Sequence, residues 1–349
     1  MMKKIICILC VLSTVFLFSC KREESVNESE KNNSAQTQSA TDNLNISDTE
    51  ISSTEKETTE KEKETETEVQ KYQGGQNKFG LTNIRKNALS ESQYEAYKVI
   101  INGMDEGRTE IPIDLTREAN SYNRIKSAIW SSYPLYALVQ EMHYYHNTKT
   151  LSIRYSKSGD ELTNTIKAFY DKIDSIITKD LMVLDDTSKA LQIYKFIAEK
   201  STSDNNNLTV YDFIMNGKGT DIQFSMAYEY CLGLAGVECN HASSEIGEKQ
   251  IALTQVKIGN NYYYMSPYHE AKKNDGKLLE FFGMNDDRAK ITTGAKVFFS
   301  INNDYEKVSL PECNDTAFDF TKYLEKWSLD TDKKELTYMI TDNIYTYKY

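Results

Sequence analysis

The sequence predicts an α+β fold, and three observations carry that prediction. Over residues 77–180 the apolar side chains recur mostly at helical spacing. A more apolar helix begins near Asp221, and its inward residues also follow helical spacing: Phe224, Ala227, Cys231 and Leu234. Two runs rich in β-branched and aromatic residues come next, Ile251–Ile258 and Tyr262–Met265. We therefore expect a mostly helical subdomain, followed by a buried helix packed on an antiparallel sheet.

A capping signal predicts the first helix. Ser90 is followed three residues later by Gln93, which is the spacing of a capping box. Apolar residues then fall on one helix face: Tyr94, Tyr97 and Ile101. Gly103 and Gly107 are expected to end the helix.

The rest of residues 77–180 is expected to form two more helices around a hairpin. A short helix, indicated by Ile125, Ile129 and Trp130, is expected to stop at Pro134. Leu135–Tyr145 and Thr150–Tyr155 are predicted to be strands on either side of a polar turn. A long helix follows, marked by apolar residues at helical spacing: Leu162, Ile166, Phe169, Ile173 and Ile177.

Residues 181–349 are predicted to form the second part of the fold. Asp186 or Thr187 caps a helix whose inward residues follow at helical spacing: Ala190, Leu191, Tyr194 and Ile197. The glycines before Asp221 permit a tight turn into the apolar helix. Gly259-Asn260-Asn261 joins the two later strands as a hairpin.

The most informative segment contains Asn216-Gly217-Lys218-Gly219-Thr220-Asp221, then Ala227-Tyr228-Glu229-Tyr230, then Leu234-Ala235-Gly236-Val237-Glu238-Cys239. It resembles the nucleophile segment of bacterial transglutaminase-like proteins. In that family a glycine turn leads to a catalytic cysteine at the start of a buried helix. Asp221 stands at the position of that cysteine, so the resemblance implies the frame without its nucleophile.

Later segments extend the resemblance. Ile251–Ile258 is similar to the strand that opens with the family's catalytic histidine, and Tyr262–Pro267 to the strand that ends with its catalytic aspartate. Those two positions hold Ile251 and Ser266. Phe281–Asp287 resembles the aromatic-then-acidic segment that often follows. The resemblance spans about residues 80–349 and is sharpest over about 185–290. It implies a papain-like core that has changed at all three catalytic positions.

The residue at the nucleophile position decides what chemistry remains. A cysteine nucleophile acts as the thiolate, which a helix N-terminus and a neighbouring histidine stabilise. Asp221 keeps the negative charge there, since a helix start favours a carboxylate by about 0.3–1 kcal/mol, and we expect it to be the N-cap residue. A carboxylate nucleophile needs a partner acid, which Ile251 and Ser266 do not supply. The sequence therefore predicts no catalytic residue at these positions.

The other cysteines are predicted to be structural. Cys231 lies on the apolar face of the motif helix. Cys239 and His241 share one face of a strand without an evident third ligand, so they predict no metal site. With Cys313 they leave an odd, irregularly spaced set, which is a poor disulfide framework.

The remaining histidines give one candidate. His143 and His146 bracket two tyrosines and are expected to oppose each other on a strand. His269 closely follows Ser266-Pro267 and lies near the old catalytic position by this reasoning. The sequence has no phosphate loop, HExxH motif or Gly-x-Ser-x-Gly motif, so no cofactor or metal is expected.

These observations predict a non-catalytic, transglutaminase-like binding or scaffolding module. The alternative is an active thiol hydrolase or amide-transferring enzyme that uses a relocated residue. We expect the old catalytic cleft to persist as a groove for an extended peptide or a cell-envelope polymer. Its predicted lining is Asp221, Gln223, Tyr262, Tyr264, Tyr268 and His269. Because strand side chains alternate, Tyr262 and Tyr264 should share one face and Tyr263 the other.

The first 20 residues are predicted to be a lipoprotein signal peptide. Lys3 and Lys4 precede an apolar run over Ile5–Phe18 that is short for a membrane span. Leu17-Phe18-Ser19-Cys20 resembles a lipobox, with Phe18 where a small residue is usual. Cys20 is therefore the expected lipidation site, which implies an extracytoplasmic protein anchored to the membrane; an uncleaved anchor is the alternative.

Residues 21–76 are predicted to be a disordered acidic tether rich in Glu, Thr, Ser and Lys. Few large apolar residues are available to offset the chain entropy of folding. Residues 21–71 carry 7 basic and 14 acidic side chains, and the whole chain has a net charge of −11. The globular part is mildly acidic as well, so nothing in the sequence indicates a nucleic-acid partner.

Overall fold

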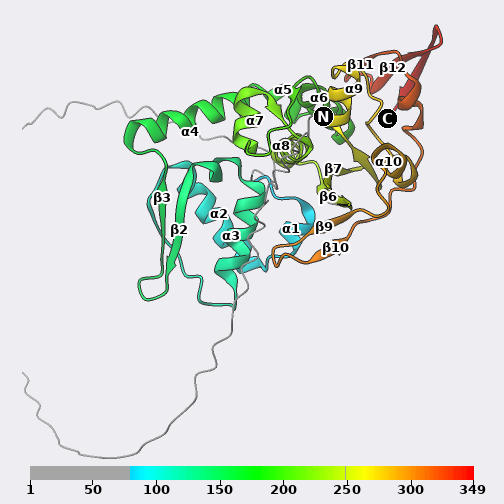
Figure 1. Cartoon of the computed structure of the whole chain (residues 1–349). Helices are drawn as coiled ribbons and strands as arrows, with labels where there is room; N and C mark the ends of the chain where they lie inside the picture. Colours follow the sequence, from blue (N-terminus) through cyan, green and yellow to red (C-terminus); the bar gives the residue numbers. More distant parts are fainter. Residues whose placement is uncertain (1–78, 248) are drawn as a thin grey trace, which may run out of the picture. The chain divides into compact units, whose positions relative to one another are not determined.

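The computed structural model describes residues 79–247 and 249–349. The predicted signal peptide, the lipidation site at Cys20 and the acidic tether at 21–76 lie outside these residues. Helices and antiparallel sheets alternate along the described chain, so the predicted α+β class is confirmed (Figure 1). Among the residues described, none of the helices has the length and apolar content needed to cross a bilayer.

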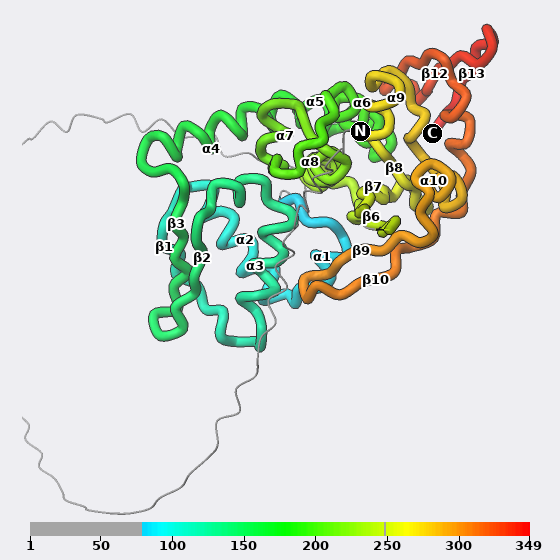
Figure 2. Tube along the Cα trace, viewed as in Figure 1, coloured from blue at the N-terminus to red at the C-terminus, as the bar shows by residue number. Residues whose placement is uncertain are grey.

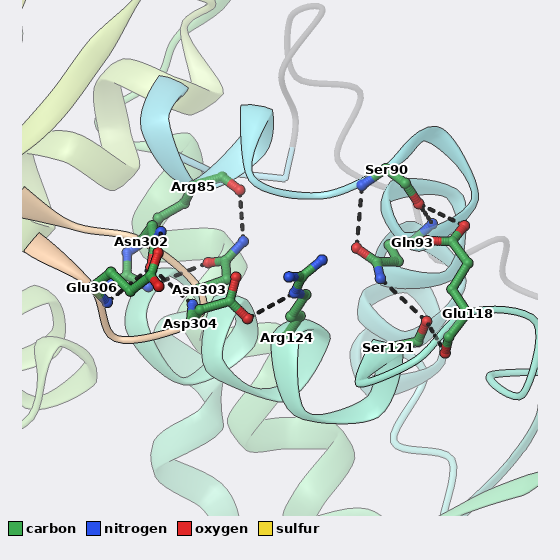
Figure 3. Close-up of polar contacts among 10 residues, drawn as sticks. All are labelled: Arg85, Ser90, Gln93, Glu118, Ser121, Arg124, Asn302, Asn303, Asp304 and Glu306. Atoms are coloured by element: carbon green, nitrogen blue, oxygen red, sulfur yellow. Dashed lines mark hydrogen bonds and ion pairs between the residues drawn. The ribbon is translucent and has the colours of Figure 1, made fainter. Parts of the chain in front are cut away.

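The N-terminal part contains three helices and a small sheet. The helices are α1 (Asn83–Asn87), α2 (Glu91–Asp105) and α3 (Ser121–Ser132). The predicted capping box is confirmed, because the Ser90 side chain accepts the Gln93 N–H and the Gln93 side chain accepts the Ser90 N–H. The Gln93 amide also donates to Ser121 Oγ at 3.2 Å, which ties α2 to the start of α3 (Figure 3).

The predicted hairpin forms with a shorter first strand. Residues 135–138 belong to the 3-10 helix η1 (Pro134–Leu138), because proline at its start fixes a helical φ. Strands β2 (Val139–Tyr145) and β3 (Thr150–Tyr155) then pair antiparallel. The short strand β1 (Glu110–Pro112), which the sequence did not indicate, adds to give the order β1-β3-β2. His146 lies in the turn after β2, so its predicted place on the strand is wrong.

Four helices lead to the motif segment: α4 (Gly159–Asp174), α5 (Lys179–Met182), α6 (Asp186–Ala198) and α7 (Val210–Asn216). The N-cap of α6 is Asp185, one residue before the predicted cap, because its carboxylate accepts the Ser188 N–H at 3.1 Å. Two-residue strands β4 (Ser201–Thr202) and β5 (Lys218–Gly219) pair parallel beside α7.

Helix α8 (Asp221–Leu234) is the central element, and nearly all of its residues are buried. It packs on a five-stranded antiparallel sheet with the order β10-β9-β6-β7-β8 (Figures 1 and 2). The strands are β6 (Cys239–Ile246), β7 (Lys249–Ile258), β8 (Asn261–Met265), β9 (Phe299–Ile301) and β10 (Lys307–Ser309). The predicted hairpin is β7–β8, with Thr254 opposite Met265 and Ile258 opposite Asn261.

Apolar clusters cover both faces of this sheet. The larger cluster joins α8, α6 and the N-terminal helices, so one core spans both sides of the predicted boundary at residue 180. A smaller cluster covers the other face with residues that include Tyr264, Phe281, Met284 and Phe298. Helices α9 (Pro267–Asn274) and α10 (Asp286–Thr293) lie in the connections between β8 and β9.

The chain ends in a separate antiparallel sheet with the order β11-β12-β13. It follows the 3-10 helix η2 (Asp319–Tyr323) and consists of β11 (Lys326–Asp330), β12 (Glu335–Ile340) and β13 (Asn343–Lys348). Its β12–β13 hairpin, drawn in red, projects from one end of the structure (Figure 2).

The β9–β10 turn fastens the sheet to the N-terminal helices. Asn303 donates to the Arg85 carbonyl at 2.7 Å, and the Arg85 guanidinium donates back to the Asn303 side chain at 3.4 Å (Figure 3). Asp304 pairs with Arg124 of α3 at 2.7 Å. Arg85 and Asn303, which are 218 positions apart in the sequence, therefore meet in one polar contact layer.

Candidate functional site

Local geometry places Asp221 at the first position of α8. Gly217 ends α7 with φ of 68°, a conformation that favours glycine. A Cβ on Gly219 would lie 2.7 Å from the Phe213 ring and 2.9 Å from Gln223 Cβ, so this turn also requires glycine. The N-cap is Thr220 and not Asp221, which corrects the sequence prediction by one residue.

Gln223 is part of the turn rather than of an open groove. Its Oε1 accepts the Thr220 N–H at 2.9 Å and the Thr220 hydroxyl at 2.7 Å. Its amide donates to the Leu208 carbonyl at 2.9 Å, and the side chain is buried. The prediction that Gln223 lines a groove is therefore wrong, because its polar atoms stabilise the backbone that leads into α8.

The Asp221 carboxylate joins the start of α8 to β7. Its Oδ2 accepts the backbone N–H of Ala252, the residue after Ile251, at 3.1 Å. Asp221 also acts electrostatically on His269, where its charge opposes the effect of burial. Ser266 is the N-cap of α9, and its hydroxyl lies 2.7 Å from His269 Nδ1. These contacts link the start of α8, the first half of β7 and the end of β8.

The Ser266–His269 pair has the spacing of a nucleophile and its base, but its hydroxyl is buried. Ser266 is only 1% exposed, and its hydroxyl also accepts the His269 N–H in the first turn of α9. Burial lowers the pKa of His269, with Lys272 adding to the effect. The hydrogen bond between the Ser266 hydroxyl and His269 Nδ1 satisfies two largely buried polar groups, which is a structural role.

Each cysteine in the described part is buried and unpaired, namely Cys231, Cys239 and Cys313. Burial raises the pKa of Cys231 and of Cys313 to about 12, and it raises the pKa of Cys239 well above its usual value. The predicted core position of Cys231 on α8 is confirmed, with no exposed surface. Cys239 points its thiol toward the Glu229 carbonyl at 3.7 Å.

A buried network of hydrogen bonds between α8, β6 and β7 was not predicted from the sequence. Glu229 Oε1 lies 2.8 Å from His241 Nδ1 and accepts the Thr254 hydroxyl at 3.3 Å. Thr254 continues to Ser225 Oγ at 3.0 Å. The charge of Glu229 also acts on the buried Arg85, whose pKa burial lowers to about 10. One signal was available, because Glu229 is the one charged residue in 227–234, the buried part of α8 that is otherwise rich in apolar residues.

This network stabilises the packing of α8 on the sheet. Glu229 is 4% exposed, and His241 is half-buried. It joins α8, β6 and β7 in a single set of hydrogen bonds. Within residues 79–247 and 249–349 no group of three or more His, Cys, Asp or Glu side chains has the geometry to hold a metal ion.

The tyrosines of β8 alternate as expected but do not form one groove. Tyr263 packs edge-on against Phe318 in the larger cluster, while Tyr262 and Tyr264 belong to the smaller one. Tyr264 is 2% exposed against Phe298, so its predicted place in a groove is wrong. Tyr264 is buried because residues that follow β8 in the sequence, such as Phe281 and Met284, pack on this face of the sheet.

Tyr262 and Tyr268 lie at opposite ends of the β7–β8 hairpin. Tyr262 pairs with Lys257 near the turn and donates its hydroxyl to Glu238 at 2.5 Å. Tyr268 lies in α9 and packs edge-on against Phe224 near the start of α8, with ring centroids 5.6 Å apart. The predicted groove residues that remain half-exposed near the α8 start are Asp221, Tyr268 and His269.

The described surface has a hollow elsewhere, of about 360 Å³. It lies beside α10 and η2, and its lining includes Glu280, Asp287, Arg288 and Asp319. None of the predicted groove residues contributes to it. Arg288 donates to the Phe318 carbonyl and to Thr321 Oγ1, so its guanidinium holds the surrounding loops together.

No family model matches the chain, and no curated protein matches it. Among solved structures, a candidate cysteine protease from Cytophaga hutchinsonii is similar, with 12% sequence identity and a TM-score of 0.24. The match covers 37% of this chain and 61% of that one, so the chain spans about three fifths of that structure.

Proposed function

We propose that this protein is a non-catalytic binding module with a papain-like core, held at the outer face of a cell membrane by a lipid on Cys20. One observation carries the proposal. At the start of α8, where the sequence resemblance implies a nucleophilic thiol, the Asp221 carboxylate accepts the Ala252 N–H at 3.1 Å. The group at this position fastens the helix to the sheet.

The burial of the cysteines supports the same proposal. Amide chemistry of the thiol type needs a thiolate beside a base. Burial raises the pKa of Cys231 and Cys313 to about 12, which disfavours the thiolate at neutral pH. Within residues 79–247 and 249–349, neither thiol is hydrogen-bonded to a histidine; the Cys313 thiol accepts from the Gln255 amide at 3.2 Å.

The ligand we propose is an extended peptide or a cell-envelope polymer bound at the start of α8. Asp221, Ile251, Tyr268 and His269 are each half-buried, so part of each side chain is open to solvent. The Lys272 ammonium lies 5.6 Å from the centre of the Tyr268 ring. A carboxylate, an aromatic face and an ammonium group within one small area can hydrogen-bond and stack against a polar chain.

Two activity assays on the full chain test the absence of catalysis. Incorporation of a labelled amine into a glutamine-containing protein, and cleavage of a peptide library, should both stay at background. The alternative, a thiol enzyme with a relocated residue, requires turnover that iodoacetamide abolishes. Any such alkylator-sensitive turnover overturns the proposal.

A capture assay tests the binding site. The full chain should retain cell-wall fragments or an extract of surface proteins, and Asp221→Arg and Tyr268→Ala should each weaken capture about tenfold. Asp186→Arg is the matched control, because Asp186 holds the same first position on α6. Equal capture by the wild type and both site variants excludes the α8 start as the binding surface.

The anchor has its own test. Cells that express the chain and are fed a fatty-acid probe should label the protein, and Cys20→Ala should remove the label and release the protein from the membrane fraction. Labelling that persists in the variant, or an unlabelled wild-type product, contradicts the lipid anchor.

A further inference from the structure

Among residues 79–247 and 249–349, strand β13 is an edge of the C-terminal sheet, and its ladder with β12 shows which of its backbone groups point away from that sheet. The Tyr349 N–H donates to the Lys334 carbonyl at 3.2 Å, which continues the β12–β13 register by one step. In an antiparallel ladder, hydrogen-bonded pairs alternate with non-bonded pairs. The backbone groups of Tyr345 and Tyr347 therefore face β12, and those of Ile344, Thr346 and Lys348 point outward from the sheet.

The hairpin turn leads to the same assignment. Thr341 and Asp342 have φ of 47° and 63°, as in a two-residue type I′ turn. Such a turn is flanked by a hydrogen-bonded pair, here Ile340 and Asn343. Because hydrogen-bonded pairs recur at every second residue, the backbone groups of Ile344, Thr346 and Lys348 again point away from β12.

Within the described part, the one feature of the β13 edge that opposes pairing is Lys348 at its end. The register of β13 with β12 is continuous, and the strand contains no proline. Ile344 is 74% exposed and Tyr345 is 46% exposed. A regular, exposed strand of β-branched and aromatic residues is a template for another strand.

In the described part, the other edge strands of the three-stranded and five-stranded sheets have features that oppose pairing with another strand. β1 and β10 have three residues each, and β1 ends in Pro112. β2 contains a register shift next to Glu141. β8 is covered by Met284, whose N–H and carbonyl bond to Tyr264. β11 has a charged residue at each end, Lys326 and Asp330. The contrast singles out β13.

We propose that β13 pairs antiparallel with β13 of a second copy of this chain, centred on Thr346, so that the two C-terminal sheets become one. This register places Ile344 opposite Lys348 and Tyr345 opposite Tyr347. All the outward backbone groups of the strand find partners, which gives about six ladder hydrogen bonds. A register centred on Tyr345 gives only about four within the strand bounds.

Side-chain chemistry favours a second copy of the chain as the occupant. Lys348 faces Ile344 and not another lysine, so like charges do not meet. Lys348 Nζ already pairs with Glu335 of β12 at 2.8 Å, which balances its charge beside the interface. The Tyr345–Tyr347 pairs extend the stack in which Tyr338 and Tyr345 already lie, with ring centroids 5.5 Å apart.

Cysteine cross-linking of the full chain in detergent tests the register. Thr346→Cys should form a disulfide-linked dimer under mild oxidation, because each copy meets its own residue at the centre. Ile344→Cys and Lys348→Cys should not do so alone, but a mixture of the two should. A Thr346→Cys variant with no more dimer than the parent, or equal cross-linking by all single variants, overturns the proposal.

Light scattering on the full chain tests the interface without cysteines. Ile344→Lys places a lysine opposite Lys348 at both symmetry-related contacts and should raise the dimer dissociation constant about tenfold. Ile291→Lys is the matched control, since Ile291 is 84% exposed on α10 and should leave dimerisation unchanged. A parent that stays monomeric at high concentration, or an equal effect of the two variants, overturns the proposal.

Discussion

Replacing Asp221 by alanine tests the central interpretation of the α8 start. In the structure this carboxylate accepts the Ala252 N–H at 3.1 Å, in a partly buried setting. A hydrogen bond to a charged group contributes about 1.5–3 kcal/mol to stability, and partial exposure favours the lower value. The charge at the helix N-terminus adds about 0.3–1 kcal/mol. We therefore expect Asp221→Ala to lower the free energy of unfolding by about 2 kcal/mol.

Two further variants separate these contributions. Asp221→Asn keeps an acceptor oxygen and loses the charge, so it should cost less than half as much as the alanine variant. Asp186→Ala removes an exposed carboxylate from the same position of α6, so only the charge at the helix start is lost, and it should cost about 0.5 kcal/mol.

Urea unfolding followed by far-UV circular dichroism measures these differences on the full chain. Equal losses in Asp221→Ala and Asp186→Ala show that the bond to Ala252 does not stabilise the fold. The account of Asp221 as a tie between α8 and β7 then fails.

Three other predictions follow from the same packing. Asp221→Cys should place a thiol at a helix start, which lowers its pKa, so iodoacetamide should label it faster than the buried native cysteines; equal labelling rates refute this placement. Tyr264→Ala should cost about 3–5 kcal/mol in urea unfolding, whereas Tyr323→Ala, at a 60% exposed position, should cost under about 1 kcal/mol; similar losses contradict the buried position of Tyr264. Burial lowers the pKa of His269, so the unfolded chain binds more protons as the pH falls below about 6.5, and acid should destabilise the fold through this group. The stability difference between about pH 7.5 and about pH 5.5 should therefore shrink in His269→Gln, and an unchanged difference argues against it.

Local signals in the sequence determined several elements. The Ser90–Gln93 capping box, the spacing of apolar residues in α8 and the turn of the β7–β8 hairpin each depend on a few neighbouring residues. The alternation of Tyr263 and Tyr264 also follows from strand geometry alone. Predictions of this kind hold because propensity, capping and period act over only one or two turns of chain.

Those local signals do not predict which residues become buried by segments that are distant in the sequence. Tyr264 was expected in a groove, but Phe298 and other residues far along the chain cover it. The C-terminal sheet was not predicted from the sequence, although it is a meander of consecutive strands, β11-β12-β13, joined by short turns. Distance along the chain also hid the polar network of Glu229, whose partners His241 and Thr254 come from two different strands.

The sequence by itself determined that Asp221, at the start of an apolar helix, occupies the position of the nucleophile, because this requires only the amino-acid type at that position. Only the tertiary structure decided what this residue does. Its carboxylate bonds to Ala252 because β7 passes the α8 start, and strand placement depends on the packing of the whole core. The thiols are likewise identified by sequence, but the surrounding core raises their pKa by removing the water that stabilises a thiolate.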